Sequence, residues 1–421
     1  MFCQFHTFVH SCMKQFNVPT TYRSPLIAAI KKQRKEADKL KKDFSPTHID
    51  LGNLQIYLAR HFGFCYGVEN AIEIAFETVR QHPDKRIFLL SEMIHNPQVN
   101  ADLMELGVSF LQDTKGNQLI SFDSLTPDDI VMIPAFGTTL AIEAELAARG
   151  IPTAPYNTTC PFVEKVWNRG EQIAAKGYTI VVHGKPTHEE TRATFSRAAS
   201  LTPTVIVNDM KEAMLLATFI TGEKKTSEFE HYFAGQYSEG FNPEKHLKKL
   251  GVINQTTQLS SDTLAISEYL KKVMIAHYQP SPEDVAQYFA DTRDTLCYAT
   301  NDNQTAVKHL LQTPAQLAIV IGGYNSSNTS HLVELCEQQL PTWFIDSADR
   351  LLSPHQIEHR NWKTKELIMV EQYLPQHIPT AILITSGASC PDSVVESVIH
   401  KLAMFYAAET AWKAVQLEWC K

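Results

Sequence analysis

Three cysteines that lie far apart in the chain share one kind of local sequence: Cys65, Cys160 and Cys297. Each comes directly before an amphipathic helical pattern, so each is predicted to lie near the positive end of a helix, where a thiolate is stabilised. Taken alone, each reads as a buried core thiol. Their common setting favours an iron–sulfur cluster, which cysteine thiolates hold, and three ligands without a fourth leave one iron open. An open iron indicates a redox enzyme rather than an electron carrier.

The remaining five cysteines lack this setting. We interpret Cys336 as a core residue, leave Cys390 open, and treat Cys3, Cys12 and Cys420 as bystanders near the ends of the chain. Eight cysteines in 421 residues are too few for a disulfide scaffold, and no CxxC pair suggests a zinc ribbon or a thioredoxin-like motif. A reducing compartment fits best.

Three small polar loops each follow a predicted strand: residues 322–330, 385–389 and 254–257. Hydroxyls, amides and backbone N–H groups at a helix start form an anion site, although a single loop of this kind is normally just a helix cap. Three such loops converging on one cavity would form a phosphate or diphosphate cradle. The chain has no Walker-type and no GxGxxG motif, so a nucleotide is not indicated.

Two histidine segments also follow apolar strands, one at Ile94–His95 and one from His183 to Thr191. His188 and Glu190 in the second segment are two residues apart, so in extended backbone they point to the same side. A glutamate in a closed, dry site has a raised pKa and can deliver a proton. The alternative without a catalytic role is that the glutamate only begins a helix and that each histidine is a hydrogen-bonded core residue.

Strand and helix patterns alternate along the chain and would position these groups. Buried strands are predicted at 55–59, 86–90, 130–135, 178–182, 205–207, 252–254, 318–321, 342–345 and 381–384, and helices at 68–79, 140–149 and 304–311. Such alternation predicts an α/β fold with mainly parallel sheets covered by helices, whose ligands bind at the carboxyl ends of strands. One central cavity facing three α/β domains would bring the cysteines together.

The three cysteines divide the chain into units of comparable size, although no sequence repeat relates them. We expect an N-terminal extension at 1–53, α/β domains at 54–159, 160–296 and 297–400, and a C-terminal helical tail at 401–421. The second domain carries an expected insertion near 221–250, which is polar and aromatic. The dense mixed charge of residues 28–43 predicts a solvated helix packed on one side.

Composition narrows the classes of function further. A net charge of −8 argues against a nucleic-acid partner, which needs a basic face, and 44% hydrophobic residues are ordinary for a globular protein. No apolar run approaches the roughly 20 residues of a transmembrane helix. The start at Met1 lacks acidic residues before Glu36 but is no clear transit peptide, and Met13 is an alternative start. We therefore expect a cytoplasmic bacterial protein, with the plastid stroma as the weaker alternative.

Eight motifs, in order between about residue 55 and about residue 402, resemble one known family. They are FGFCYGVENA, IHNP, TTCPFVEKV, HEETRAT, NQTT, CYATNDNQ, GGYNSSNTSHL and TSGASCPD. The family is 4-hydroxy-3-methylbut-2-enyl diphosphate reductase, the last enzyme of the non-mevalonate isoprenoid pathway. The chain most resembles the branch of plants and cyanobacteria, which carries an N-terminal extension. The resemblance implies three α/β domains around a cavity that holds a [4Fe-4S] cluster.

The resemblance also implies roles for individual residues. The cluster ligands would be Cys65, Cys160 and Cys297; the diphosphate-binding residues would be His95, His188, Ser326, Ser327, Asn328 and Ser389; and the active-site acid and threonine would be Glu190 and Thr256. One departure stands out, because many bacterial members have a histidine where this chain has Phe136. Phenylalanine cannot donate a hydrogen bond, so that contact is either absent or made by a neighbour such as Thr138.

The implied reaction is the reductive removal of a hydroxyl from an allylic diphosphate, which yields isopentenyl and dimethylallyl diphosphate. Its electrons would come from a donor such as ferredoxin or flavodoxin, with no membrane partner. The residues themselves leave other classes open: another open-iron enzyme, such as a hydro-lyase or a quinolinate synthase-like protein, or an iron–sulfur sensor. A zinc hydrolase is a distant third, because the chain has no HExxH motif.

Overall fold

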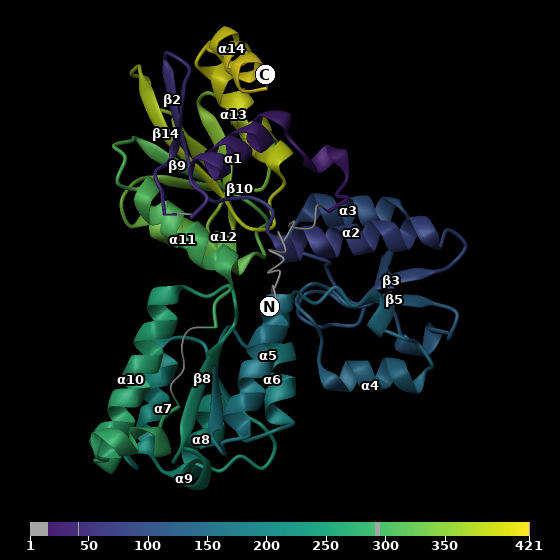
Figure 1. Cartoon of the computed structure of the whole chain (residues 1–421), viewed down its shortest axis with the longest axis vertical. Helices are drawn as coiled ribbons and strands as arrows, with labels where there is room; N and C mark the ends of the chain where they lie inside the picture. Colours follow the sequence, from purple (N-terminus) through teal and green to yellow (C-terminus); the bar gives the residue numbers. More distant parts are fainter. Residues whose placement is uncertain (1–15, 41, 291–294, 421) are drawn as a thin grey trace, which may run out of the picture.

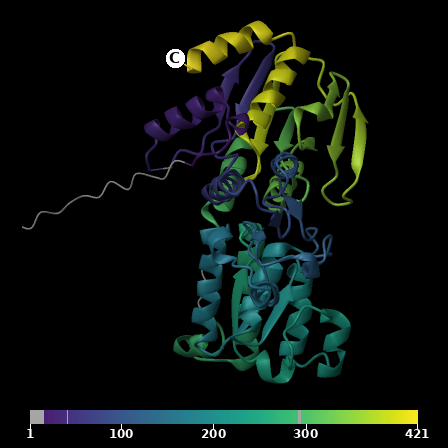
Figure 2. The same cartoon turned by 90° about the vertical axis from the view of Figure 1, so that its right-hand side faces the viewer.

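The computed structural model describes residues 16–40, 42–290 and 295–420. The chain forms three lobes that meet at one place (Figure 1), and the first and last parts of the chain lie side by side in the same lobe (Figures 1 and 2). The expectations about Met1, Met13, Cys3 and Cys12 lie outside the described residues. Within the described part, no helix is both long and apolar enough to cross a bilayer.

The first lobe, here called the five-stranded unit, is built from both ends of the chain. Its sheet has the order β1-β2-β14-β9-β10, in which only β1 is antiparallel. The strands are β1 (Thr47–Asp50), β2 (Leu54–Leu58), β9 (Leu317–Ile321), β10 (Thr342–Ile345) and β14 (Thr380–Ser386). The helices are α1 (Pro25–Ala37), α11 (Tyr298–Leu310), α12 (Ser327–Glu337), α13 (Asp392–Phe405) and α14 (Glu409–Trp419), with short 3₁₀ turns at Thr20–Tyr22 and Ala348–Arg350. A small antiparallel sheet is added by β11 (Leu351–Ser353), β12 (Gln356–Arg360) and β13 (Leu367–Glu371).

The other two lobes each contain a three-stranded parallel sheet. The β3 unit has the order β4-β3-β5, and the β6 unit has the order β7-β6-β8. The β3 unit comprises α2 (Tyr66–Gln81), β3 (Ile87–Leu89), α3 (Pro97–Glu105), β4 (Ser109–Phe110), β5 (Ile130–Met132) and α4 (Leu140–Ala148), with 3₁₀ turns at Phe122–Ser124 and Ala154–Tyr156. The β6 unit comprises α5 (Pro161–Ala174), β6 (Thr179–His183), α6 (Glu189–Ala199), β7 (Thr204–Val207), α7 (Met210–Ile220), α8 (Phe229–Phe233), α9 (Pro243–His246), β8 (Leu250–Asn254) and α10 (Ser260–Tyr278), with 3₁₀ turns at Thr226–Glu228 and Pro282–Gln287.

The predicted α/β class with mainly parallel sheets is confirmed. Every residue of β6, β8 and β9 is buried, which is why these strands read as continuous apolar runs rather than as alternating ones. Local capping sets the helix starts. Asn96 accepts a hydrogen bond from the backbone N–H of Val99 at 3.0 Å, and Pro97 occupies the first helical position, where its missing N–H costs nothing.

Strand pairing differs from the expected domain limits in the N-terminal part. We expected β2 to open the unit at 54–159, but β2 pairs with β14 in the five-stranded unit. The segment expected as an extension also joins that unit, because Leu26, Ile27 and Ile30 of α1 are buried in its core. The helix α1 is solvated on its charged side, as predicted, but it ends at Ala37 and does not continue to residue 43. Phe16, Val18 and Tyr22 pack in the core of the β3 unit, so this segment bridges two lobes.

The segment near 221–250 also differs from a simple surface insertion. Phe229 and Phe233 of α8 are buried in the same hydrophobic cluster as Val205 of the sheet. Gln236 accepts a backbone hydrogen bond from Ile206 at 2.7 Å, and Tyr237 bridges to Val205. This segment therefore completes the β6 unit.

Helix α14 anchors the end of the chain through Trp412, which is 2% exposed. We predict that Trp412→Ala destabilises the five-stranded unit by about 3–5 kcal/mol, because a large buried side chain is replaced by a cavity. Leu417→Ala on the same helix is the control, since Leu417 is 70% exposed and its loss should change stability by no more than about 0.5 kcal/mol. Thermal and denaturant unfolding would measure both, and equal shifts would contradict the anchoring role.

Candidate functional site

A cavity of about 90 Å³ lies where the three lobes meet. It is open at the carboxyl ends of parallel strands from all three units, where α/β folds bind ligands. All the residues that the sequence singled out line it: Cys65, His95, Cys160, His188, Glu190, Thr256, Cys297, Ser326, Ser327, Asn328 and Ser389. Among the described residues, no Lys or Arg side chain is part of its lining.

Each of the three cysteines is the N-cap of a helix. Cys65 precedes α2, Cys160 precedes α5 and Cys297 precedes α11. The Cys297 sulfur lies 3.4 Å from the backbone nitrogen of Thr300 and 3.1 Å from its hydroxyl. Backbone N–H groups also point at the other two sulfurs, from Gly67 and Val68 for Cys65 and from Phe162 and Val163 for Cys160. The predicted placement at positive helix ends is confirmed.

Burial favours the protonated, neutral form of these three thiols. It raises the pKa of Cys160 to about 11, and it raises the pKa values of Cys65 and Cys297 as well. The nearness of the other two thiols raises the pKa of Cys65 further. Three thiolates so placed need a positively charged partner, and bound metal supplies the charge that reverses this preference.

The thiols fit a polynuclear group better than a single ion. Within residues 16–40, 42–290 and 295–420, no three His, Cys, Asp or Glu side chains converge on a point that one metal ion would occupy. Three thiols around one cavity instead match a group large enough to reach them all. Gly67 keeps this space open, because a β-carbon there would lie 2.4 Å from the Cys160 sulfur.

Glu190 and Thr256 form the closest polar pair of the cavity. The backbone N–H of Thr256 donates to Oε1 of Glu190 at 2.6 Å, and the threonine hydroxyl lies 3.0 Å from Oε2. Glu190 is 1% exposed, and this burial raises its pKa to about 7 although the Thr256 hydrogen bonds act in the opposite direction. A carboxyl group with this pKa can donate a proton near neutral pH.

His188 is prepared as a neutral donor. Its Nδ1 accepts the backbone N–H of Glu190 at 3.2 Å, which places the ring proton on Nε2. Burial lowers the pKa of His188 well below its usual value, so the ring is uncharged at neutral pH. Nε2 is buried without a hydrogen-bond partner among the described residues. An acceptor atom of a ligand would satisfy it.

His95 is held from several sides. Its Nε2 lies 3.0 Å from Oε2 of Glu189, and its ring stacks on Phe136 with centroids 4.2 Å apart. Its backbone carbonyl accepts the hydroxyl of Ser389 at 3.0 Å. A β-carbon on Gly323 would lie 2.1 Å from that carbonyl, so glycine is required there. The ring of Phe136 packs on both histidines, His95 and His188. Thr138 is buried but does not line the cavity, so it does not replace the histidine that many bacterial members have at position 136.

The loops after β9 and β14 lock together at the other end of the cavity. The hydroxyl of Ser326 caps α12 by accepting the N–H of Thr329 at 3.2 Å. Oδ1 of Asn328 accepts the backbone N–H of Ala388 at 2.9 Å, and the Nδ2 of Asn328 is buried without a partner in the described part of the chain. Ser327 is half-buried beside them. Hydroxyl and amide donors here face the same space as His188.

Sequence reasoning missed three contributors. Glu189 supports His95, Thr300 contacts the Cys297 sulfur, and Thr257 lines the cavity beside Thr256. The pair of glutamates at the start of α6 was a visible signal, but two acidic residues in a first helical turn are ordinary. Cys336, interpreted as core, is buried in the five-stranded unit, as is Cys390, and Cys420 is exposed.

The N-terminal segment braces the loop that carries Cys65. Three aromatic residues surround this cysteine, and each is contacted by one residue of the segment. The ring of Phe16 packs on Tyr66 at 4.9 Å and that of Tyr22 on Phe64 at 6.1 Å. The ammonium of Lys31 lies 4.5 Å from the ring of Phe62 and 2.6 Å from Oδ1 of Asp392. The segment therefore fixes one side of the cavity.

Comparison with known proteins assigns the chain to a family. The family model described as LytB protein matches residues 56–403. A 4-hydroxy-3-methylbut-2-enyl diphosphate reductase from Synechococcus sp. (strain CC9902) is 39% identical over 388 residues, covering 92% of this chain and 91% of that protein. The reductase of that name from Synechococcus sp. (strain RCC307) is 41% identical over 352 residues, covering 83% and 84%.

A solved structure shares the fold. The E-1-hydroxy-2-methyl-but-2-enyl-4-diphosphate reductase of Plasmodium falciparum aligns with a TM-score of 0.58 and 21% identity, covering 83% of this chain and 87% of that one. At this identity the likeness shows the fold alone, whereas the family model and the cyanobacterial relatives cover the cavity residues as well. The chain belongs to the LytB family, together with cyanobacterial 4-hydroxy-3-methylbut-2-enyl diphosphate reductases.

Proposed function

We propose that the chain reduces 4-hydroxy-3-methylbut-2-enyl diphosphate to isopentenyl and dimethylallyl diphosphate, the last step of the non-mevalonate pathway. One observation carries the proposal: three thiols at helix starts, a buried acid and a set of neutral anion-binding donors all line a single cavity. Family membership and relatives of that name support the same reaction.

The reaction removes the substrate hydroxyl as water and uses two electrons and two protons. One proton leaves with the hydroxyl, and the other is added to carbon at one of two positions, which gives the two products. We assign Cys65, Cys160 and Cys297 as ligands of a [4Fe-4S] cluster. When bound, the cluster would supply the two electrons and a Lewis-acidic open iron.

The diphosphate would be held by His95, His188, Ser326, Ser327, Asn328 and Ser389. Support comes from two buried donors, Nε2 of His188 and Nδ2 of Asn328, which have no partner among the described residues, because each gains a hydrogen bond when an anionic oxygen arrives. Away from bulk water such donors interact strongly with the ligand. Fixing the diphosphate end aims the hydroxyl end toward the cysteines, which is a positioning effect.

Glu190 would deliver the protons, with Thr256 as its relay. The threonine hydroxyl lies 3.0 Å from the carboxyl group and lines the cavity, so it can pass a proton from Glu190 to the substrate. Burial gives Glu190 a pKa of about 7, which keeps a large fraction of it protonated at neutral pH.

Electrons would come from a small donor protein such as ferredoxin or flavodoxin. We place the reaction in the bacterial cytoplasm, because reduced thiols need a reducing compartment. The plastid stroma, also reducing, is the weaker alternative.

The first test is turnover itself. The protein, purified without oxygen, is given the hydroxylated diphosphate and a chemically reduced viologen, and oxidation of the dye is followed. Substrate-dependent oxidation that is lost after exposure to air supports the reductase. A cluster-bearing protein that gives no such oxidation favours a hydro-lyase, which needs no electrons, or a sensor.

We predict that Cys160→Ala loses the visible absorbance of the cluster and the activity together, because the cluster loses one of its three thiolate ligands. Cys336→Ala is the matched control, since Cys336 is a buried free thiol in the core of the five-stranded unit. It should keep both properties. A Cys160→Ala protein that retains absorbance and activity removes Cys160 from the ligand set.

We predict that Glu190→Gln keeps the cluster and binds substrate but lowers kcat by on the order of 10²-fold, because glutamine cannot donate a carboxyl proton. The acid form is the active form and its pKa is about 7, so the wild-type kcat should fall as pH rises through 7. The variant should lack this decline. Glu143→Gln, which alters an ion-paired glutamate of α4, is the control. A near-normal rate for Glu190→Gln would show that Glu190 does not deliver the proton.

A further inference from the structure

Two adjacent glutamates at the start of α6 face different partners. Glu190 contacts Thr256 of the β6 unit, whereas Glu189 reaches across to the β3 unit. Glu189 is 5% exposed, and the hydroxyl of Ser91 donates to its Oε1 while Nε2 of His95 lies 3.0 Å from its Oε2. Among the described residues, no Lys or Arg forms an ion pair with this carboxylate.

This contact holds one edge of the His95 ring. A carboxylate oxygen only accepts hydrogen bonds, so the proton shared with Glu189 lies on Nε2 of the histidine. Phe136 stacks on the ring face at an interplanar angle of 23°, which prevents the ring from tilting away. Glu189 therefore holds the edge of the His95 ring, and Phe136 holds its face.

The two histidines are thus fixed in different ways. A backbone N–H fixes His188 through its Nδ1 and leaves Nε2 for the ligand, whereas a carboxylate fixes His95 through its Nε2. The rings meet edge to face with centroids 5.2 Å apart. Misplacing His95 would disturb the anion site and leave the two hydrogen bonds between Glu190 and Thr256 in place.

We propose that Glu189, supported by Ser91, is a positioning residue for substrate binding, which fixes the ring of His95 at the anion site. This inference rests on the proposed function, and it concerns binding of the anion rather than proton delivery. Removal of Glu189 should therefore weaken binding and leave the chemical step largely unchanged, the reverse of the effect expected for Glu190.

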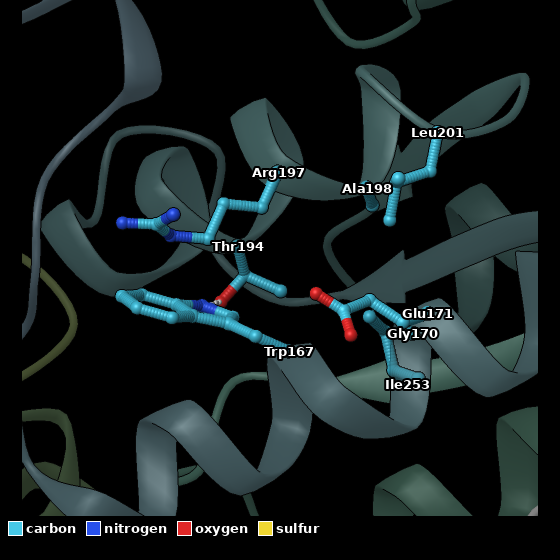
Figure 3. A pocket seen from close by; sticks show the side chains of 8 residues that line it. All are labelled: Trp167, Gly170, Glu171, Thr194, Arg197, Ala198, Leu201 and Ile253. Atoms are coloured by element: carbon cyan, nitrogen blue, oxygen red, sulfur yellow. Dashed lines mark hydrogen bonds between the residues drawn. The ribbon is translucent and has the colours of Figure 1, made fainter. Parts of the chain in front are cut away.

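A second carboxylate supplies the matched control. Glu143 of α4 also joins the β3 unit to the β6 unit, through an ion pair of 2.5 Å with Arg197 near the far end of the same helix α6. There the guanidinium of Arg197 lies over the indole of Trp167, whose Nε1 donates to Thr194 (Figure 3). This contact links the same two units but does not touch His95, so Glu143→Ala reports on the link between units alone.

The experiment measures turnover and anion binding separately in the cluster-loaded enzyme. Glu189→Ala should raise KM for the hydroxylated diphosphate by on the order of 10-fold, because a buried hydrogen bond to a charged group is lost, while kcat stays within about threefold. Binding of inorganic diphosphate, measured by calorimetry, should weaken by a similar factor. Glu189→Gln keeps an acceptor for Nε2 and should restore both values to within about threefold of the wild type. Glu143→Ala should change neither.

Each other outcome is decisive. Unchanged KM and diphosphate affinity in Glu189→Ala would overturn the proposal, as would a loss confined to kcat. A Glu189→Gln protein as impaired as Glu189→Ala would assign the effect to charge and not to positioning. If Glu189→Ala does not fold, Ser91→Ala carries the test, because it removes a donor to Glu189 and should weaken diphosphate binding while kcat is kept; unchanged affinity would overturn the proposal. A wild-type protein that binds diphosphate but gives no turnover refutes the proposed reaction, while diphosphate affinity still tests Glu189.

Discussion

The rest of the structure depends on bringing three thiols to the lining of one cavity, each at the start of a helix. Cys65 lies where the chain passes from the five-stranded unit to α2, Cys160 where it passes from the β3 unit to α5, and Cys297 where it returns from the β6 unit to α11. The three cysteines therefore mark the three passages between lobes. No single lobe can assemble the cavity, because each contributes one helix start, and the positive end of that helix stabilises one thiolate. The same arrangement puts the carboxyl ends of the parallel strands around the cavity, so the groups that follow those strands face it without any long loop.

A second constraint is the absence of cationic side chains from the described lining. An anion must then be held by donors other than Lys and Arg, and such donors work best when their geometry is fixed. Two of the polar groups are paired through one atom, which orients another. Asn328 uses its Oδ1 on Ala388, which orients Nδ2, and His188 uses its Nδ1 on the backbone of Glu190, which orients Nε2. These two donors are buried without a partner in the described part of the chain, which costs roughly 1–3 kcal/mol each, and a bound anion would recover that energy.

Local sequence patterns made many strands, helix starts and the three cavity cysteines predictable. Buried strands appear as apolar runs, and caps such as Asn96 with Pro97 mark helix starts whatever the tertiary structure does. The cysteines were recognisable because Cys65, Cys160 and Cys297 share a local setting that the structure reproduces. Pairings between distant segments were not predictable. The sequence pattern of a buried strand does not indicate which strand it pairs with, so the pairing of β2 with β14 could not be predicted. The hydrogen bond from Asn96 to the backbone of Ser389 spans 293 positions and has no local signature.

Glu189 and Glu190 show most directly why environment, and not residue type, assigns a role. They are neighbours in one helical turn, carry the same functional group and are both buried. The carboxyl group of Glu190 accepts hydrogen bonds from the backbone N–H and the hydroxyl of Thr256, but burial dominates and its pKa rises to about 7. Glu189 meets an imidazole and a serine hydroxyl, which satisfy both of its oxygens. A carboxyl group left with a proton to give suits chemistry, whereas one held as an acceptor suits orientation. In the sequence the two glutamates look equivalent. Their different partners come from strands and loops that the fold brings together from other parts of the chain.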